Sequence, residues 1–136
     1  MKKVILYCDG GARGNPGPAA IGVVLLNAGG KIIKEAAAYL GEQTNNQAEY
    51  KALLRGLEEA KKIKADEVNI FMDSELVVKQ IKREYKVKDA ELAKLFVKVW
   101  NLLNSFSRYS IKHVPRARNS RADALVNREL DKFKFN

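Results

Sequence analysis

The chain has 136 residues, of which 46% are hydrophobic and 30% charged, a composition typical of one globular domain. No apolar run reaches the roughly 20 residues of a membrane-crossing helix, and the single cysteine excludes an internal disulfide or a zinc site built from cysteines. The net charge of +9 is uneven, +1 in residues 1–74 and +8 in 75–136, which favours a polyanionic partner such as nucleic acid, with a merely soluble basic surface as the alternative.

The first third of the chain predicts three strands. Residues 3–9 read as a short apolar strand without alternation, typical of a strand covered on both faces. The apolar run stops at Asp9 with no small-residue cleavage site, so we expect no signal peptide, and the lone Cys8 favours a reducing, cytoplasmic location. The Gly- and Pro-rich segment 10–18 predicts a loop, and strands at 20–27 and 31–40, joined by a Gly-containing turn, predict an antiparallel hairpin.

The rest of the chain predicts helices that alternate with two strands. Thr44 and Gln47 fit a capping box at the start of a helix over 44–64. After it we expect a strand at 67–72, helices over 74–84 and 90–104, a strand at 108–114, a loop at 115–118 and a last helix from 119 or 120 to 132. Trp100, at helical spacing from Phe96, is expected in the core. The order βββαβααβα predicts a single α/β domain over 1–136, with a five-stranded mixed sheet and helices on both faces.

Two carboxylates end apolar strands, Asp9 the first strand and Asp73 the fourth. If these strands are parallel neighbours, both carboxylates lie at the carboxyl edge of the sheet, where open α/β sheets bind ligands. Each also has an ordinary explanation when it is taken singly. Asp9 suits a Gly-flanked turn, and Asp73 suits the N-cap of a helix.

Two further carboxylates lie on predicted helices. Glu49 shares the core-facing side of its helix with Ala, Leu, Gly and Ile residues, whereas the opposite side carries Gln47, Lys51, Arg55, Glu58, Glu59 and Lys62. An inward carboxylate needs a partner or a metal, unless it reaches solvent from the edge of the stripe. Asp123 lies in the first turn of the last helix, where an acid is favoured by the helix dipole, amid Arg116, Arg118, Arg121 and Arg128.

Three or four carboxylates that converge at a sheet edge form a cluster of hard oxygen ligands, which suits Mg²⁺ or Mn²⁺. Clustered acids would repel a polyanion unless cations lie between them, so the pattern points to two-metal phosphodiester chemistry. The chain has no P-loop, no nucleophile elbow and one histidine, which leaves little machinery for other reactions.

Four segments resemble, in the right order, the motifs of the ribonuclease H type 1 family. They are DGGARGNPG at 9–17, TNNQAE at 44–49, MDS at 72–74 and NSRADAL at 119–125. Each segment supplies one carboxylate, and together they cover essentially the whole chain. The chain resembles a short form of the family, because it passes from Glu84 to Asp89 without a basic protrusion and keeps only Lys86 and Lys88 there.

The resemblance implies a ribonuclease H-like fold and an endonuclease that hydrolyses the RNA strand of RNA/DNA hybrids, leaving 5′-phosphate and 3′-hydroxyl ends. It implies that two Mg²⁺ ions, with Mn²⁺ as an alternative, are held by Asp9, Glu49, Asp73 and Asp123. One ion would activate the attacking water and the other would stabilise the leaving oxygen.

The resemblance also implies substrate contacts. Short side-chain amides suit the ribose 2′-hydroxyl, and the expected contacts are Gly10, Gly11, Arg13, Asn15, Thr44, Asn45, Asn46, Lys86 and Lys88. His113 occupies the place of a catalytic histidine of the family, although Pro115 stiffens the segment that follows and a structural role is equally expected.

The expected partner is an RNA/DNA hybrid, with no membrane, and the expected state is a monomer. Two other functions stay open: a hybrid- or RNA-binding module that has lost catalysis, which the four acids disfavour, and an integrase-type or related nuclease domain that acts on other strands, which the TNN segment disfavours. Cleavage of double-stranded RNA is also left open.

Overall fold

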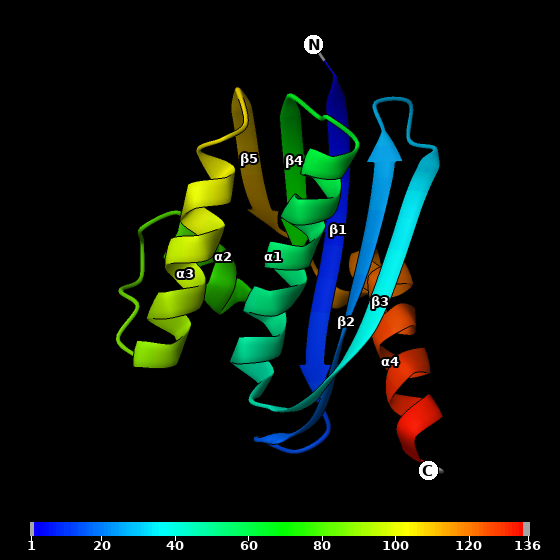
Figure 1. The fold of residues 1–136 in the computed structure, drawn as a ribbon, viewed down its shortest axis with the longest axis vertical. Coiled ribbons are helices and arrows are strands. Elements are labelled where there is room, and N and C mark those ends of the chain that lie inside the picture. Colours follow the sequence, from blue (N-terminus) through cyan, green and yellow to red (C-terminus); the bar gives the residue numbers. More distant parts are fainter. Residues whose placement is uncertain (1, 135–136) are drawn as a thin grey trace.

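The computed structural model describes residues 2–134 and shows a five-stranded sheet with helices on both faces (Figure 1). The elements are β1 (Lys3–Ala12), β2 (Gly17–Asn27), β3 (Ile32–Gln43), α1 (Asn45–Lys62), β4 (Glu67–Met72), α2 (Glu75–Ile81), α3 (Ala90–Leu103), β5 (Arg108–His113), η1 (Arg116–Asn119) and α4 (Ser120–Lys134). This confirms the predicted order of strands and α-helices. The short 3₁₀ helix η1 occupies most of the predicted loop at 115–118.

The strands are arranged in the order β3-β2-β1-β4-β5. β1, β2 and β3 pair antiparallel, which confirms the predicted hairpin, whereas β1 pairs parallel with β4 and β4 with β5. Figure 1 shows α1 and α3 on one face of the sheet and α4 on the other. The parallel pairing places the carboxyl ends of β1 and β4 at one edge, as the carboxylate prediction required. No helix within residues 2–134 has the length and apolar character to cross a membrane.

The main core lies between the sheet and the first three helices. Leu6 and Cys8 of β1 are fully buried against α1, where Leu53 and Leu57 are also fully buried. α1 begins with the predicted capping box. At the start of α2, the Ser74 hydroxyl accepts a hydrogen bond from the amide of Val77 at 3.2 Å, so Ser74 is the N-cap and the side chain of Asp73 is left for another role.

Four predicted boundaries or positions were wrong. The segment 10–18 is a loop only over 13–16, because Gly10, Gly11 and Ala12 continue β1 and pair with β2. Asp9 therefore lies within β1 rather than at its end, although the pairing of β1 with β4 stops two residues earlier. Helix α2 ends at Ile81, short of the predicted 84. Trp100 is only half-buried, and its ring stacks on Phe96 at 5.8 Å between centroids.

Glu59 was predicted on the solvent-facing side of α1, and this was also wrong. It is only 1% exposed, and its carboxylate forms ion pairs with Lys34, with Arg55 at 3.0 Å and with Lys62 at 3.3 Å. The hydrogen bond with Lys34, helped by those with the other two cations, lowers the pKa of Glu59 to about 2. Lys34 comes from β3, and helical spacing alone does not reveal a strand that covers this side of α1.

Candidate active site

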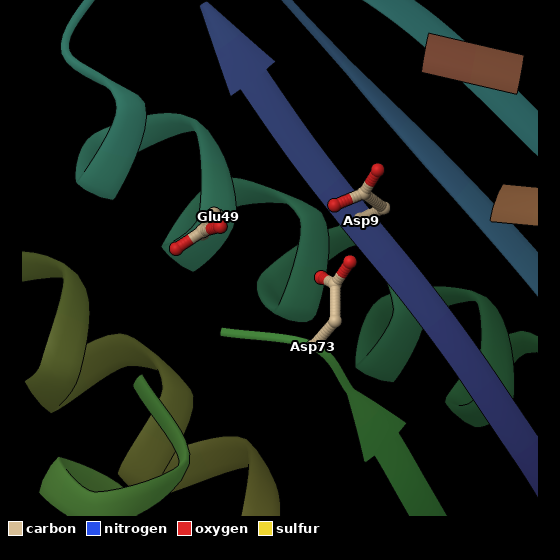
Figure 2. Close-up of side chains that lie close together, drawn as sticks. All are labelled: Asp9, Glu49 and Asp73. Atoms are coloured by element: carbon tan, nitrogen blue, oxygen red, sulfur yellow. The ribbon is translucent and has the colours of Figure 1, made fainter. Parts of the chain in front are cut away.

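Three of the predicted carboxylates converge at the carboxyl end of β4, where its pairing with β1 stops (Figure 2). Asp9 lies on β1, Asp73 directly follows β4, and Glu49 faces them from α1. Each offers a carboxylate oxygen, and these oxygens all lie within 4.8 Å of one another. β1 and β4 pair as far as Tyr7 and Phe71, so both aspartates lie just beyond the paired region, on the same side of the sheet.

A glycine makes the approach of Glu49 possible. Gly10 follows Asp9 on β1 and lies directly against the main chain of Ala48 in α1. A Cβ atom at position 10 would overlap the carbonyl group of Ala48. The absence of a side chain therefore lets the first turns of α1 pack onto β1 and bring Glu49 next to Asp9.

Asp123 reaches the same site from the other face of the sheet. Gly22 pairs with Asp9 across β1 and β2, and a Cβ there would overlap the carbonyl oxygen of Ala122, so α4 begins directly over Asp9. Asn119 fixes this junction, because its buried Nδ2 donates a hydrogen bond to the carbonyl of Cys8 at 2.9 Å. Asp123 lies close enough to Asp9 to raise the pKa of that carboxyl, although it lies outside the mutual 4.8 Å cluster of the other three.

Burial of like charges dominates the electrostatics of the site. Burial, followed by the repulsion of the carboxylates of Asp73, Asp123 and Glu49, raises the pKa of Asp9 to about 8. Burial also raises the pKa of Glu49 to about 7, an effect that hydrogen bonds with Ser74 and Asn45 oppose. Ionised together, these carboxylates repel one another, and a bound cation would relieve that repulsion.

The donor set fits divalent cations that prefer oxygen. Three carboxylates from separate elements supply only hard oxygen ligands, which suit Mg²⁺ or Mn²⁺ rather than a thiophilic metal. Cys8 is nearby in sequence, but its buried thiol points into the core, and burial followed by the repulsion of the carboxylates raises its pKa well above the ordinary value. A neutral thiol is a poor ligand, so the carboxylates are the residues that could hold metal.

The carboxylates line a cleft of about 440 Å³, and several of the predicted substrate residues line it too. These are Gly10, Gly11, Arg13 and Asn45. Asn45 is already engaged at both ends of its amide, because its Oδ1 accepts a hydrogen bond from the amide of Ala12 at 3.3 Å and its side chain also bonds Glu49. Asn15 Oδ1 accepts a hydrogen bond from the amide of Asn45 at 3.0 Å, which ties the 13–16 loop to the start of α1.

Other predicted site residues lie outside the lining of this cleft. Thr44 uses its hydroxyl to cap α1, and Asn46 follows in the first turn. His113 ends β5 beside Met72 and is exposed. The pKa of the nearby Glu75 carboxyl is lowered mainly by Lys79 and to a smaller extent by His113. Lys86 and Lys88 are exposed on the connection between α2 and α3. Their roles stay predictions.

Two residues of the cleft had no assigned role from the sequence. Arg116 Nη2 donates a hydrogen bond to Asp123 Oδ1 at 3.1 Å, and Asn127 Nδ2 donates to Asp123 Oδ2 at 3.3 Å. Arg13 Nη2 donates to Asn127 Oδ1 at 3.4 Å and pairs with Asp131 at 2.8 Å. Asn127 could have been found, because it lies four residues after Asp123 and therefore on the same helical face. The contact of Arg116 depends on the path of η1, which no motif indicated.

Comparison with known proteins gives consistent matches. The family described as "Reverse transcriptase-like" matches residues 7–129. A relative from Halobacterium salinarum named "Ribonuclease HI" is 46% identical over 129 residues, which cover 95% of this chain and 65% of the relative. The chain spans 36% of the length of its mycobacterial relatives.

Two solved structures are closely similar to the chain. The crystal structure of RNase H1 from Halobacterium salinarum has a TM-score of 0.94 at 46% identity, covering 96% of this chain and 98% of that one. The crystal structure of LC11-RNase H1 in complex with an RNA/DNA hybrid has a TM-score of 0.90 at 46% identity, covering 95% of this chain and 97% of that one.

Proposed function

This chain belongs to the ribonuclease H type 1 family, and we propose that it is an endonuclease that hydrolyses the RNA strand of RNA/DNA hybrids, leaving 5′-phosphate and 3′-hydroxyl ends. The observation that carries the proposal is the convergence of Asp9, Glu49 and Asp73 within 4.8 Å, with Asp123 on the same cleft. The hybrid bound to LC11-RNase H1 supports the choice of substrate.

We propose Mg²⁺ as the cofactor, with two ions held by the four carboxylates and Mn²⁺ as an alternative. Bound divalent cations supply Lewis-acid stabilisation and a water of lowered pKa. The contribution of the chain is to bring four acids from β1, α1, the end of β4 and α4 to one point, and to keep that point partly buried. Burial disfavours the ionised form of Asp9 when no cation is bound, and a bound metal ion would stabilise that form.

The neighbouring side chains are proposed to hold the hybrid. Asn45 lines the cleft, and Asn15 and Asn46 are its neighbours where α1 meets the 13–16 loop. Side-chain amides can both donate to and accept from a ribose 2′-hydroxyl. Contact through Asn45 requires exchange of one of its present hydrogen bonds. Gly10, Gly11, Arg13 and Thr44 would complete this region, and His113 is proposed to assist from the exposed end of β5.

Lys86 and Lys88 are proposed to contact phosphates from the α2–α3 connection, which runs along the side of the molecule down to the start of α3 (Figure 1). We further propose that residues 1–136 form one domain that acts as a monomer in the cytoplasm, the lone buried Cys8 suiting a reducing compartment. A hybrid-binding module without catalysis is the rival function. The close approach of Asp9, Glu49 and Asp73, with Asp123 on the same cleft, disfavours it, because these acids would weaken hybrid binding unless cations joined them.

The proposal is tested with four end-labelled substrates: RNA/DNA hybrid, double-stranded RNA, double-stranded DNA and single-stranded RNA, each with Mg²⁺ and with chelator. We expect cleavage of the RNA strand of the hybrid, only with the metal. Hybrid binding without cleavage in Mg²⁺ and in Mn²⁺ would favour the binding module. Cleavage of double-stranded RNA would widen the substrate class, and cleavage of DNA would favour an integrase-type nuclease.

A further inference from the structure

The connection between α2 and α3 (82–89) is a short segment that several contacts hold in place. Arg83 has a left-handed backbone with φ of +68°, and its amide donates to the carbonyl of Gln80 at 3.0 Å. The amide of Glu84 donates to the carbonyl of Lys79 at 2.8 Å. The Arg83 guanidinium lies 5.5 Å from the centre of the Trp100 ring, and Asp89 caps α3. These contacts hold both ends of the segment.

The middle of the segment is held by one buried side chain. Gln80 is 4% exposed, and its Nε2 donates a hydrogen bond to the carbonyl of Lys86 at 3.2 Å. Its Oε1 accepts a hydrogen bond from the hydroxyl of Tyr50 at 2.5 Å. Tyr50 is fully buried in α1 and is the residue directly after Glu49. A chain of two hydrogen bonds therefore joins the helix of Glu49 to the backbone of Lys86.

From this arrangement we propose that Gln80 is a positioning residue for substrate, which sets the α2–α3 connection, and with it Lys86 and Lys88, at a fixed place relative to the catalytic helix α1. The inference rests on the proposed function, in which these lysines contact the hybrid. Both polar ends of Gln80 are satisfied in a buried place, which an apolar side chain of the same length would not achieve. The Lys86 carbonyl would then have to turn toward water, and the lysines would move with it.

The fixed backbone of this short connection matters for hybrid binding. A lysine on a flexible backbone can still reach a phosphate. On contact, however, it then loses backbone conformational entropy in addition to side-chain entropy. With the backbone held by Gln80, two adjacent cations meet the phosphates at a preset spacing. Loss of Gln80 should therefore weaken hybrid binding and leave the carboxylate chemistry unchanged, because within residues 2–134 the side chain of Gln80 forms its hydrogen bonds with Tyr50 and Lys86 and with none of the three clustered carboxylates.

The test compares the full chain with Q80M, Y50F, K86Q and the double variant Q80M/K86Q, with K98Q as the control for loss of one exposed lysine on α3. Melting temperatures confirm folding, and kcat and KM are measured on a labelled hybrid in Mg²⁺. We expect Q80M to raise KM by about three- to tenfold with kcat within twofold of wild type, Y50F to raise it less, and K98Q to leave it unchanged. K86Q should cost less in the Q80M background than in wild type, because the two changes act on one contact.

Hydrogen exchange of the free protein supplies a readout independent of catalysis. Amides of 82–89 should exchange faster in Q80M and Y50F, with those of β1 unchanged. An unchanged KM in Q80M, additive effects of Q80M and K86Q, or unchanged exchange of this segment would each overturn the positioning role. A wild-type protein that does not cleave hybrid would instead overturn the proposed function. In that case, equal hybrid dissociation constants of Q80M and wild type would overturn the positioning role as well.

Discussion

Arg116 and Asp123 form a hydrogen-bonded ion pair at 3.1 Å across the rim of the cleft, so the fourth carboxylate of the site has a cation of its own. Asp9 and Glu49 are in the opposite situation, because burial and neighbouring carboxylates raise their pKa values. The carboxylates of the site therefore differ in how their negative charge is balanced. Asp123 is balanced by an arginine, whereas Asp9 and Glu49 require protons or metal ions.

The first prediction is that R116Q tightens Mg²⁺ binding. The arginine competes with a cation for Asp123, but its side chain is 75% exposed, so solvent screening limits the effect. The Mg²⁺ dissociation constant, measured by calorimetry without substrate, should fall by up to about fivefold. R118Q is the matched control, since Arg118 is an exposed arginine of the same η1 helix. Equal affinities in R116Q and wild type, or an equal gain in R118Q, would show that the ion pair does not compete with metal.

The second prediction is that D9N stabilises the metal-free protein. Asp9 is 7% exposed and its raised pKa means that its ionised form is disfavoured in the fold. Below the ordinary pKa of 3.8, folded and unfolded chains both hold the proton, so Asp9 costs nothing. As the pH rises from there to about 8, only the unfolded chain releases its proton, and the free energy of unfolding falls.

In chelator at pH 8, D9N should therefore unfold with a free energy about 1–3 kcal/mol higher than wild type. The difference should shrink toward pH 4, and Mg²⁺ should stabilise wild type more than D9N. Denaturant unfolding at several pH values measures this, with E91Q as a control for loss of one exposed acid. If D9N is less stable than wild type in chelator, Asp9 serves to hold the strand rather than to bind metal.

The third prediction concerns the contact between β1 and α1. G10A should destabilise the protein by about 1–3 kcal/mol, because its methyl group would overlap the carbonyl of Ala48 and push α1 outward. Separation of Glu49 from Asp9 should also weaken Mg²⁺ binding. G29A is the control, since a Cβ there meets only the side chain of Asn27 at 3.4 Å. Thermal unfolding and Mg²⁺ titration of both variants would decide, and a G10A protein as stable as G29A would contradict the role of Gly10.

Much of the site could be predicted from the sequence, because strands and helices place side chains at regular intervals. Parallel strands share a carboxyl edge, which predicted that Asp9 and Asp73 meet, and helical spacing predicted the inward side chain of Glu49. Contacts between distant segments were not accessible in this way. The burial of Glu59 depends on Lys34 from a strand, and the pairing of Asp123 depends on the path of η1. Gly10 and Gly11 were predicted to lie in a loop but pair with β2 as part of β1, because backbone pairing requires no side chain.

The fourth prediction is that salt weakens hybrid binding steeply and that Lys86 and Lys88 contribute to the slope. Each lysine that contacts a phosphate releases counterions, so the double variant K86Q/K88Q should reduce the slope of log K against log salt by about one to two. Fluorescence anisotropy with a cleavage-deficient D73N background gives the slopes. K98Q in that background should leave the slope unchanged. An unchanged slope in K86Q/K88Q would remove the α2–α3 connection from the binding surface.

The central claim, that the converged carboxylates bind metal to cleave RNA in a hybrid, is tested most directly by turnover of D73N in Mg²⁺. Ser74 caps α2, so this nearly isosteric change should preserve the fold and hybrid affinity. We predict that wild type cuts the RNA strand, leaving 5′-phosphate ends, and that D73N loses turnover by about a thousandfold or more. Turnover of D73N within about tenfold of wild type, equivalent to about 1.4 kcal/mol of barrier, would contradict the claim.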